Sequence, residues 1–313
     1  MSSRAWAAFA AVSVLWGIPY LFIKVAVDAG VPPGFVAFAR VALAAVVLLA
    51  LARRARVLAG LRGRTRWLVL YALVEVVIPF PLIAAGEQRI SSSLAAILIA
   101  MVPLLVALLA LRFYAAERVS GRRLFGLLVG FSGVVALVGV DVAGSSSELV
   151  GAGAVALAAC GYAAGSMILK ARLADLDPRA TMGVSLAIAA AALLPLALAD
   201  PPRSAALTGD AVMAIVGLGL LCTAIAFVLM ATLVAEVGPG RALVITYVNP
   251  VVATGLGVAI LGERPGAGAI AGLLLILAGS WLSTDGRLPP GLAALATRSR
   301  RARLSRPRSL RRA

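Results

Sequence analysis

The second half of this chain repeats the first half at a fixed offset of 146 residues, and both halves are almost entirely apolar. The residue pairs matched at this offset include Trp16 and Tyr162, Lys24 and Lys170, Glu117 and Glu263, Gly126 and Gly272, and Gly133 and Gly279. Pro103 and Pro250 correspond at an offset of 147. Internal repeats in a membrane protein with many spans are typical of secondary transporters whose site lies between the repeats.

The composition excludes a water-soluble core, because 62% of the residues are hydrophobic and only 13% are charged, against about 25% charged in soluble proteins. A transmembrane helix needs roughly 20 apolar residues, and the sequence contains ten such runs. We expect spans at 5–27, 34–52, 67–86, 91–111, 122–140, 149–170, 181–199, 211–235, 242–262 and 266–284. Lipid offers the backbone no hydrogen-bond partner, and the runs do not alternate as barrel strands do, so the spans are helices.

Each repeat contains five of these spans, over residues 5–140 and 149–284, and a basic tail follows at 285–313. Because five is odd, the second copy enters the bilayer from the opposite side, and exchange between the two half-sites would give alternating access. The predicted fold is an all-α polytopic membrane protein with ten transmembrane helices in two inverted five-helix repeats.

The distribution of positive charge predicts the orientation. With the N-terminus inside, 24 of the 29 Lys and Arg residues fall on the cytoplasmic side, and only Arg89, Arg203 and Arg264 fall outside. Cytoplasmic loops carry an excess of Lys and Arg, so we expect both termini in the cytoplasm and the chain in a bacterial plasma membrane. The Arg-rich tail, which we expect to be disordered, suits anionic lipid better than nucleic acid.

The residue types exclude most enzyme chemistry. The chain has no histidine, and its two cysteines both lie inside predicted spans, so we expect no metal site, no disulfide framework and no histidine acid–base catalysis. No G-x-x-x-x-G-K-[ST] motif is present, which argues against ATP-driven transport by this chain. We therefore expect neither an enzyme nor a bound cofactor.

Aromatic and polar residues recur at helical spacing in the first span of each repeat. Trp16, Tyr20 and Lys24 step by four and share one face, and the second repeat presents Tyr162, Ser166 and Lys170 in the same way. One interpretation is that the aromatic and hydroxyl groups line a substrate cavity. The other is that the aromatics pack between helices while each Lys extends to an interface.

Glu75 is the most costly residue in the chain, since it lies near the middle of span 3 with no charge within eight residues on either side. A carboxylate there costs roughly 3 kcal/mol, and burial favours its neutral form. Arg40 in span 2 is the obvious partner. We expect Glu75 either to carry a coupling proton or bind a substrate amine, or to form a static pair with Arg40.

Pro103 and Pro250 are predicted to interrupt spans 4 and 9, each freeing a carbonyl four residues back. Tyr247 and Asn249 lie beside the second proline and are further cavity candidates, while a plain bend without a gating role is the alternative. Glycines at four-residue spacing in spans 5 and 10 allow close helix approach, either inside the bundle or at the seam of a homodimer. Glu117 and Glu263 follow spans 4 and 9, where a structural cap or turn is favoured.

The order of these motifs resembles the EamA-type domain of the drug/metabolite transporter superfamily. In the first repeat the resemblance rests on W-G-x-P-Y-x-x-x-K, A-M-V-P-L-L, A-E-R-V and G-L-L-V-G-F-S-G-V. In the second it rests on Y-V-N-P-V-V-A, L-G-V-A-I-L-G-E-R-P and A-G-L-L-L-I-L-A-G. It implies a ten-helix inner-membrane carrier, often an exporter of amino acids or related metabolites. Tyr162, where many second repeats carry Trp, and the acid Glu75 depart from the pattern.

We therefore expect a secondary carrier that moves a small amphipathic metabolite outward, driven by protons, through a cavity between spans 1, 3 and 4 and their counterparts 6, 8 and 9. Two other classes stay open. One is a lipid-linked headgroup flippase or a subunit of one, and the other is a membrane partner protein that transports nothing.

Overall fold

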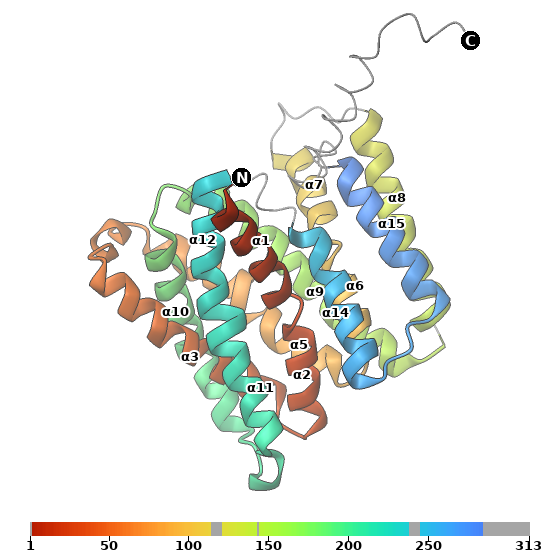
Figure 1. Ribbon diagram of the computed structural model, residues 1–313, viewed down its shortest axis with the longest axis horizontal. Coiled ribbons are helices and arrows are strands. Elements are labelled where there is room, and N and C mark those ends of the chain that lie inside the picture. Colours follow the sequence, from red (N-terminus) through yellow and green to blue (C-terminus); the bar gives the residue numbers. More distant parts are fainter. Residues whose placement is uncertain (1, 114–120, 143, 238–244, 284–313) are drawn as a thin grey trace, which may run out of the picture.

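The computed structural model describes residues 2–113, 121–142, 144–237 and 245–283, and all regular structure within them is helical (Figure 1). Eight helical stretches are long and apolar enough to cross a membrane, and two shorter apolar helices follow: Ser3–Asp28, Pro33–Arg54, Thr65–Glu87, Ser92–Leu109, Leu124–Val142, Ser146–Leu173, Pro178–Ala199, Gly209–Val237, Ile245–Leu261 and Ala267–Leu282. This pattern confirms the predicted all-helical fold of ten spans. The basic tail and Glu117 lie outside the described residues.

Several spans are built from more than one helical element. Their bounds are α1 Ser3–Leu15, α2 Pro19–Asp28, α3 Pro33–Arg54, α4 Thr65–Ala72, η2 Leu73–Val77, α5 Pro79–Glu87, α6 Ser92–Ile99, α7 Val102–Phe113, α8 Gly121–Leu137, η3 Val138–Val142, α9 Ser146–Ile168, η4 Leu169–Leu173, α10 Pro178–Ala199, α11 Gly209–Gly219, η6 Leu220–Ile225, α12 Ala226–Val237, α14 Ile245–Leu261 and α15 Ala267–Ser283. Between α3 and α4 and between α10 and α11 lie short 3₁₀ turns, Leu58–Leu61 and Ser204–Ala206.

The two prolines predicted to interrupt helices behave differently. Pro103 lies in the first turn of α7, just after the break that separates α6 from α7. By contrast, α14 runs through Pro250 without a break, so the interruption predicted there is wrong. A single proline removes one hydrogen bond of the helix, and neighbouring helices in a membrane protein can compensate for that loss.

Spans 3 and 8 each contain a π-helical segment at corresponding places in the repeat. The segment in span 3 is η2 and the one in span 8 is η6, and the offset of 146 residues superposes them to within one or two positions. In η6 the hydroxyl of Thr223 donates to the carbonyl of Leu218 at 2.7 Å, five residues earlier. Because π-helical segments are frequent at functional sites, both positions are of interest.

The packing of the spans obeys a two-fold relation between the repeats. The two most extensive contacts join α8 to α15 and α3 to α10, which are spans 5 with 10 and 2 with 7. Span 3 packs on span 6 through α5 and α9, and its counterpart, span 8, packs on span 1 through α11 and α2. Each contact therefore has its partner under exchange of the repeats. In Figure 1, α8 and α15 lie side by side at one edge of the bundle.

Glycines form the contact between α8 and α15. A Cβ added at Gly133 would lie 2.9 Å from the carbonyl oxygen of Gly272, and one added at Gly272 would lie 2.8 Å from that of Gly133. A Cβ at Gly279 would overlap the backbone of Gly130. These glycines therefore serve a contact inside the bundle, where close approach of two helices needs small residues.

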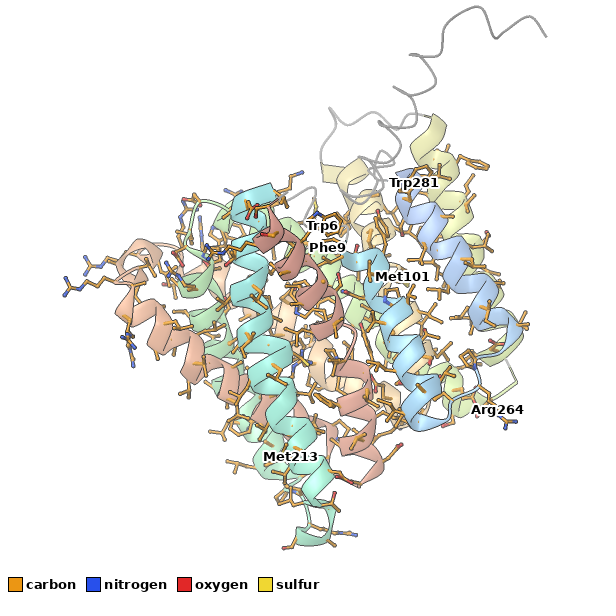
Figure 2. All side chains as sticks on the ribbon, in the orientation of Figure 1. Trp6, Phe9, Met101, Met213, Arg264 and Trp281 are labelled. Atoms are coloured by element: carbon orange, nitrogen blue, oxygen red, sulfur yellow. The ribbon has the colours of Figure 1, made fainter. Side chains whose placement is uncertain are left out.

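Large apolar side chains cover the outside of the bundle, as contact with lipid requires. Val46, Val135 and Leu198 are each about 70% exposed, and Figure 2 shows side chains such as Met213 of α11 at the outer surface. A soluble protein would not leave so many large apolar groups in water.

Candidate functional site

Glu75 lies in η2, at the π-helical segment of span 3. Its Oε2 atom is shielded from solvent and has no hydrogen-bond partner among the described residues. The carboxyl packs against Gly165 of α9, where an added Cβ would overlap Oε2. Gly165 therefore provides the space that the carboxyl occupies, and the sequence alone did not identify this pairing.

Arg40 is 9% exposed and is held by two other spans. Its Nε atom donates to Thr223 Oγ1 of η6 at 2.9 Å, and its guanidinium carbon lies 4.2 Å from the centre of the Phe80 ring of α5. It does not form the ion pair with Glu75 considered above, because Thr223 and Phe80 fix its direction. The proton-carrying role of Glu75 does not depend on that pair and stays a prediction.

Tyr20 and Tyr162 lie where the apolar clusters of the bundle meet. Tyr20 packs against two of these clusters, one around spans 4 and 5 and one around spans 1 and 8. Tyr162 also packs against the second, and against a third around spans 2, 3 and 7. Tyr162 lies one turn before Gly165 in α9, the glycine against which the Glu75 carboxyl packs. The two tyrosines therefore lie between apolar clusters that both repeats build.

The remaining cavity candidates pack in a different cluster or are exposed. Trp16 packs edge-on against Phe227 of α12, with 5.6 Å between ring centres, and shares an apolar cluster with Tyr247. The Tyr247 hydroxyl donates to the carbonyl of Ser280 at 3.3 Å. Ser166 is exposed.

Asn249 joins span 9 to span 1. With its amide nitrogen directed towards the carbonyl oxygens, it donates to Ser13 at 3.1 Å and to Ile245 at 2.9 Å. These bonds show a structural use for Asn249. Lining of a cavity by Trp16, Ser166, Tyr247 or Asn249 stays a prediction.

Glu87 is a buried acid that sequence reasoning missed. It is 0% exposed, and neither carboxyl oxygen has a hydrogen-bond partner among the described residues. Lys24 Nζ donates to the main-chain oxygen of Glu87 at 2.8 Å and pairs with Asp28 at 3.0 Å. The predicted span 3 ended at residue 86, which assigned Glu87 to the water interface. The observed helix extends one residue further and carries the acid into the protein.

Glu263 caps a helix of the other repeat. Its carboxylate accepts hydrogen bonds from the backbone amides of Ser92 at 2.7 Å and Ser93 at 3.0 Å, and a short one from the Ser93 hydroxyl. These groups form the N-terminus of α6, where unpaired amides and the helix dipole favour negative charge. Burial opposes ionisation, but the hydrogen bonds from Ser93 and Ser92 outweigh it and lower the pKa of Glu263.

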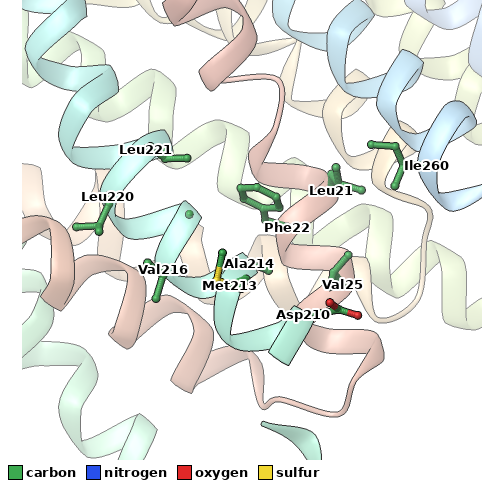
Figure 3. A pocket seen from close by; sticks show the side chains of 11 residues that line it. Leu21, Phe22, Val25, Asp210, Met213, Ala214, Val216, Leu220, Leu221 and Ile260 are labelled. Carbon is green, nitrogen blue, oxygen red and sulfur yellow. The ribbon is translucent and has the colours of Figure 1, made fainter. Parts of the chain in front are cut away.

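An apolar groove opens on the side of the bundle, between α2 and α11, with Ile260 of α14 at its edge (Figure 3). It has a volume of about 670 Å³ and, apart from Asp210, its lining side chains are uncharged and almost all apolar. Sites that orient a polar solute carry a few convergent polar groups, and these walls offer almost none. The groove suits lipid tails better than a polar solute.

Comparisons with known proteins agree with this architecture. The family model of the EamA-like transporter family matches the chain twice, over residues 4–139 and 149–284. A solved crystal structure is similar over 91% of this chain and 98% of its own chain, with a TM-score of 0.64 and 22% sequence identity, and it supports the fold alone. A search of curated protein sequences found no match. The two matches span nearly all the transmembrane region, and the family consists of membrane transporters of the drug/metabolite superfamily. The chain belongs to the EamA-like transporter family.

Proposed function

We propose that this protein exports small metabolites, amino acids or related compounds, across a bacterial plasma membrane by proton-coupled alternating access. The observation that carries the proposal is the buried Oε2 atom of Glu75 at mid-span, which has no hydrogen-bond partner among the described residues. An ionised carboxylate in such a place costs roughly 3 kcal/mol or more, so this conformation favours its neutral, protonated form. Opening of the site to water on one side would let the proton leave.

The symmetry of the packing supplies the scaffold for alternating access. Spans 3 and 6 contact one another as spans 8 and 1 do, so exchanging the two arrangements would turn a site open to one side into a site open to the other. The cap of Glu263 on α6 joins the ends of spans 9 and 4. In the proposed orientation, with both termini cytoplasmic, this contact closes the outer side.

Transport by purified protein in lipid vesicles tests the proton-carrying role. The wild type should accumulate an amino acid when a pH gradient is imposed. Glu75→Gln should still exchange labelled for unlabelled amino acid but should not accumulate it, because the amide cannot carry the proton. Glu148→Gln, at the first turn of α9, is the control and should behave as the wild type. Undiminished gradient-driven accumulation by Glu75→Gln would exclude the coupling role.

The lateral groove favours one other candidate, a flippase for lipid-linked headgroups. Its apolar walls between α2 and α11 could hold a lipid tail while a headgroup crosses the protein. Translocation of a fluorescent lipid by vesicles that move no amino acid would select this function. Movement of neither solute nor lipid would select a partner protein that does not transport.

A further inference from the structure

We propose that Arg40 binds the carboxylate of the transported solute, so that the substrate class is carboxylate-bearing metabolites such as amino acids. This inference rests on the proposed function, because it assigns a substrate contact to the same site. It concerns a residue that none of the motifs shared with the family includes.

The first argument is the cost of the charge. Arg40 lies in the second span, is 9% exposed and is paired with no carboxylate among the described residues. A buried charge without a counter-ion is costly, and ionisable residues inside a membrane protein usually mark a substrate or ion pathway. The structure thus keeps a cation where a neutral residue would be more stable.

The second argument is the direction in which the guanidinium is held. Thr223 takes the Nε hydrogen bond, and Thr223 is itself fixed by its bond to the carbonyl of Leu218. Phe80 covers one face of the group. These contacts leave the two terminal nitrogens without a hydrogen-bond partner among the described residues. That edge of the guanidinium is the one whose paired N–H groups match the two oxygens of a carboxylate.

The third argument is the position of Arg40 relative to Glu75. Phe80, which Arg40 contacts, lies five residues after Glu75 in the same span, roughly 7 Å along a helix axis. The Glu75 carboxyl packs against Gly165, one turn after Tyr162 in α9. A solute that places its carboxylate at Arg40 can therefore direct an ammonium group along span 3 towards Glu75. A guanidinium for the carboxylate and a carboxyl for the amine fit the two ends of an amino acid, and the ammonium group would displace the proton that Glu75 carries.

Equilibrium binding to the purified protein tests the assignment with three probes of similar shape: L-phenylalanine, hydrocinnamate, which lacks the amine, and phenethylamine, which lacks the carboxylate. The wild type should bind the two carboxylates at least about tenfold more tightly than phenethylamine, as a charge-assisted pair of hydrogen bonds implies. Arg40→Gln should abolish this preference. Arg40→Lys should keep only part of it, because lysine lacks the paired N–H groups.

Two further variants keep the test independent of folding. Thr223→Val leaves the charge in place but frees the guanidinium, so it should weaken carboxylate binding and leave phenethylamine binding unchanged, and Thr223→Ser should restore the wild-type preference. Arg53→Gln, an exposed residue of the same helix, should change nothing. A wild type that shows no preference for carboxylates, or an Arg40→Gln variant that keeps it, would overturn the proposal.

Flux measurements separate this inference from the proposed function. Proton-coupled transport of phenethylamine as fast as of phenylalanine would leave the transporter standing and overturn the role of Arg40. Carboxylate binding that depends on Arg40, in a protein that moves none of the three probes, would support the binding site and overturn the proposed function.

Discussion

Replacing Gly272 with Ala should weaken the contact between α8 and α15, and Gly255→Ala provides the matched control. A Cβ at Gly272 would lie 2.8 Å from the carbonyl oxygen of Gly133 and 2.8 Å from Cβ of Leu137, whereas a Cβ at Gly255 would meet nothing within 4 Å. Backbone atoms cannot rotate away, so the two helices must separate. Both substitutions gain the same helix propensity, about 1 kcal/mol, and this gain cancels in the comparison.

The difference between the two variants is then the cost of overpacking, about 1–3 kcal/mol. Thermal unfolding in one detergent should place Gly272→Ala several degrees below Gly255→Ala, at about 2–4 °C for each kcal/mol. Transport at low temperature should survive in both variants, because Arg40, Glu75 and Glu87 lie in other helices than α8 and α15. Equal melting temperatures for the two variants would refute the claim that glycines set the distance between these spans.

Three other predictions follow from polar contacts and topology. Glu263→Ala should cost about 1–3 kcal/mol of stability because it leaves buried amides of α6 unpaired. The pKa of Glu263 is lowered on folding, so the stabilisation by Glu263 should be present at neutral pH and fade on acidification. The loss should begin near the unfolded pKa of about 4.3 and be complete below the folded pKa. A difference in melting temperature between the wild type and Glu263→Ala that persists at still lower pH would contradict this. Lys24→Met should lower the stability by about 1 kcal/mol, because it removes the hydrogen bond to the Glu87 carbonyl and the half-exposed ion pair with Asp28. The same thermal melts measure this loss. Single cysteines at Asp177 and Asp210 in a cysteine-free chain should react with impermeant maleimide from the cytoplasmic side and from the outer side, respectively, and the reverse pattern would refute the predicted orientation.

The sequence was sufficient to predict the helical architecture because each span is a long apolar run and the repeat determines how many there are. Roles that depend on a contact between distant spans could not be predicted. A structural cap was expected at Glu263, but its partner, α6 in the other repeat, lies about 170 residues away, as the hydrogen bonds show. Charge alone makes Arg40 the natural partner of Glu75, while the structure directs it to Thr223.

The repeat is symmetric in its helices but not in its charges, and this difference bears on how a solute would be bound. Arg40, Glu75 and Glu87 all belong to the first repeat, and the offset of 146 places leucines at the three corresponding positions: Leu186, Leu221 and Leu233. Leu186 and Leu233 are fully buried, so a second set of charges there would add a similar desolvation cost without a second substrate to offset it. The second repeat instead contributes uncharged groups to the first set, such as Thr223 against Arg40 and Gly165 against Glu75. One binding set shared by two interchangeable scaffolds is the arrangement that alternating access requires, because the same groups must face each side of the membrane in turn.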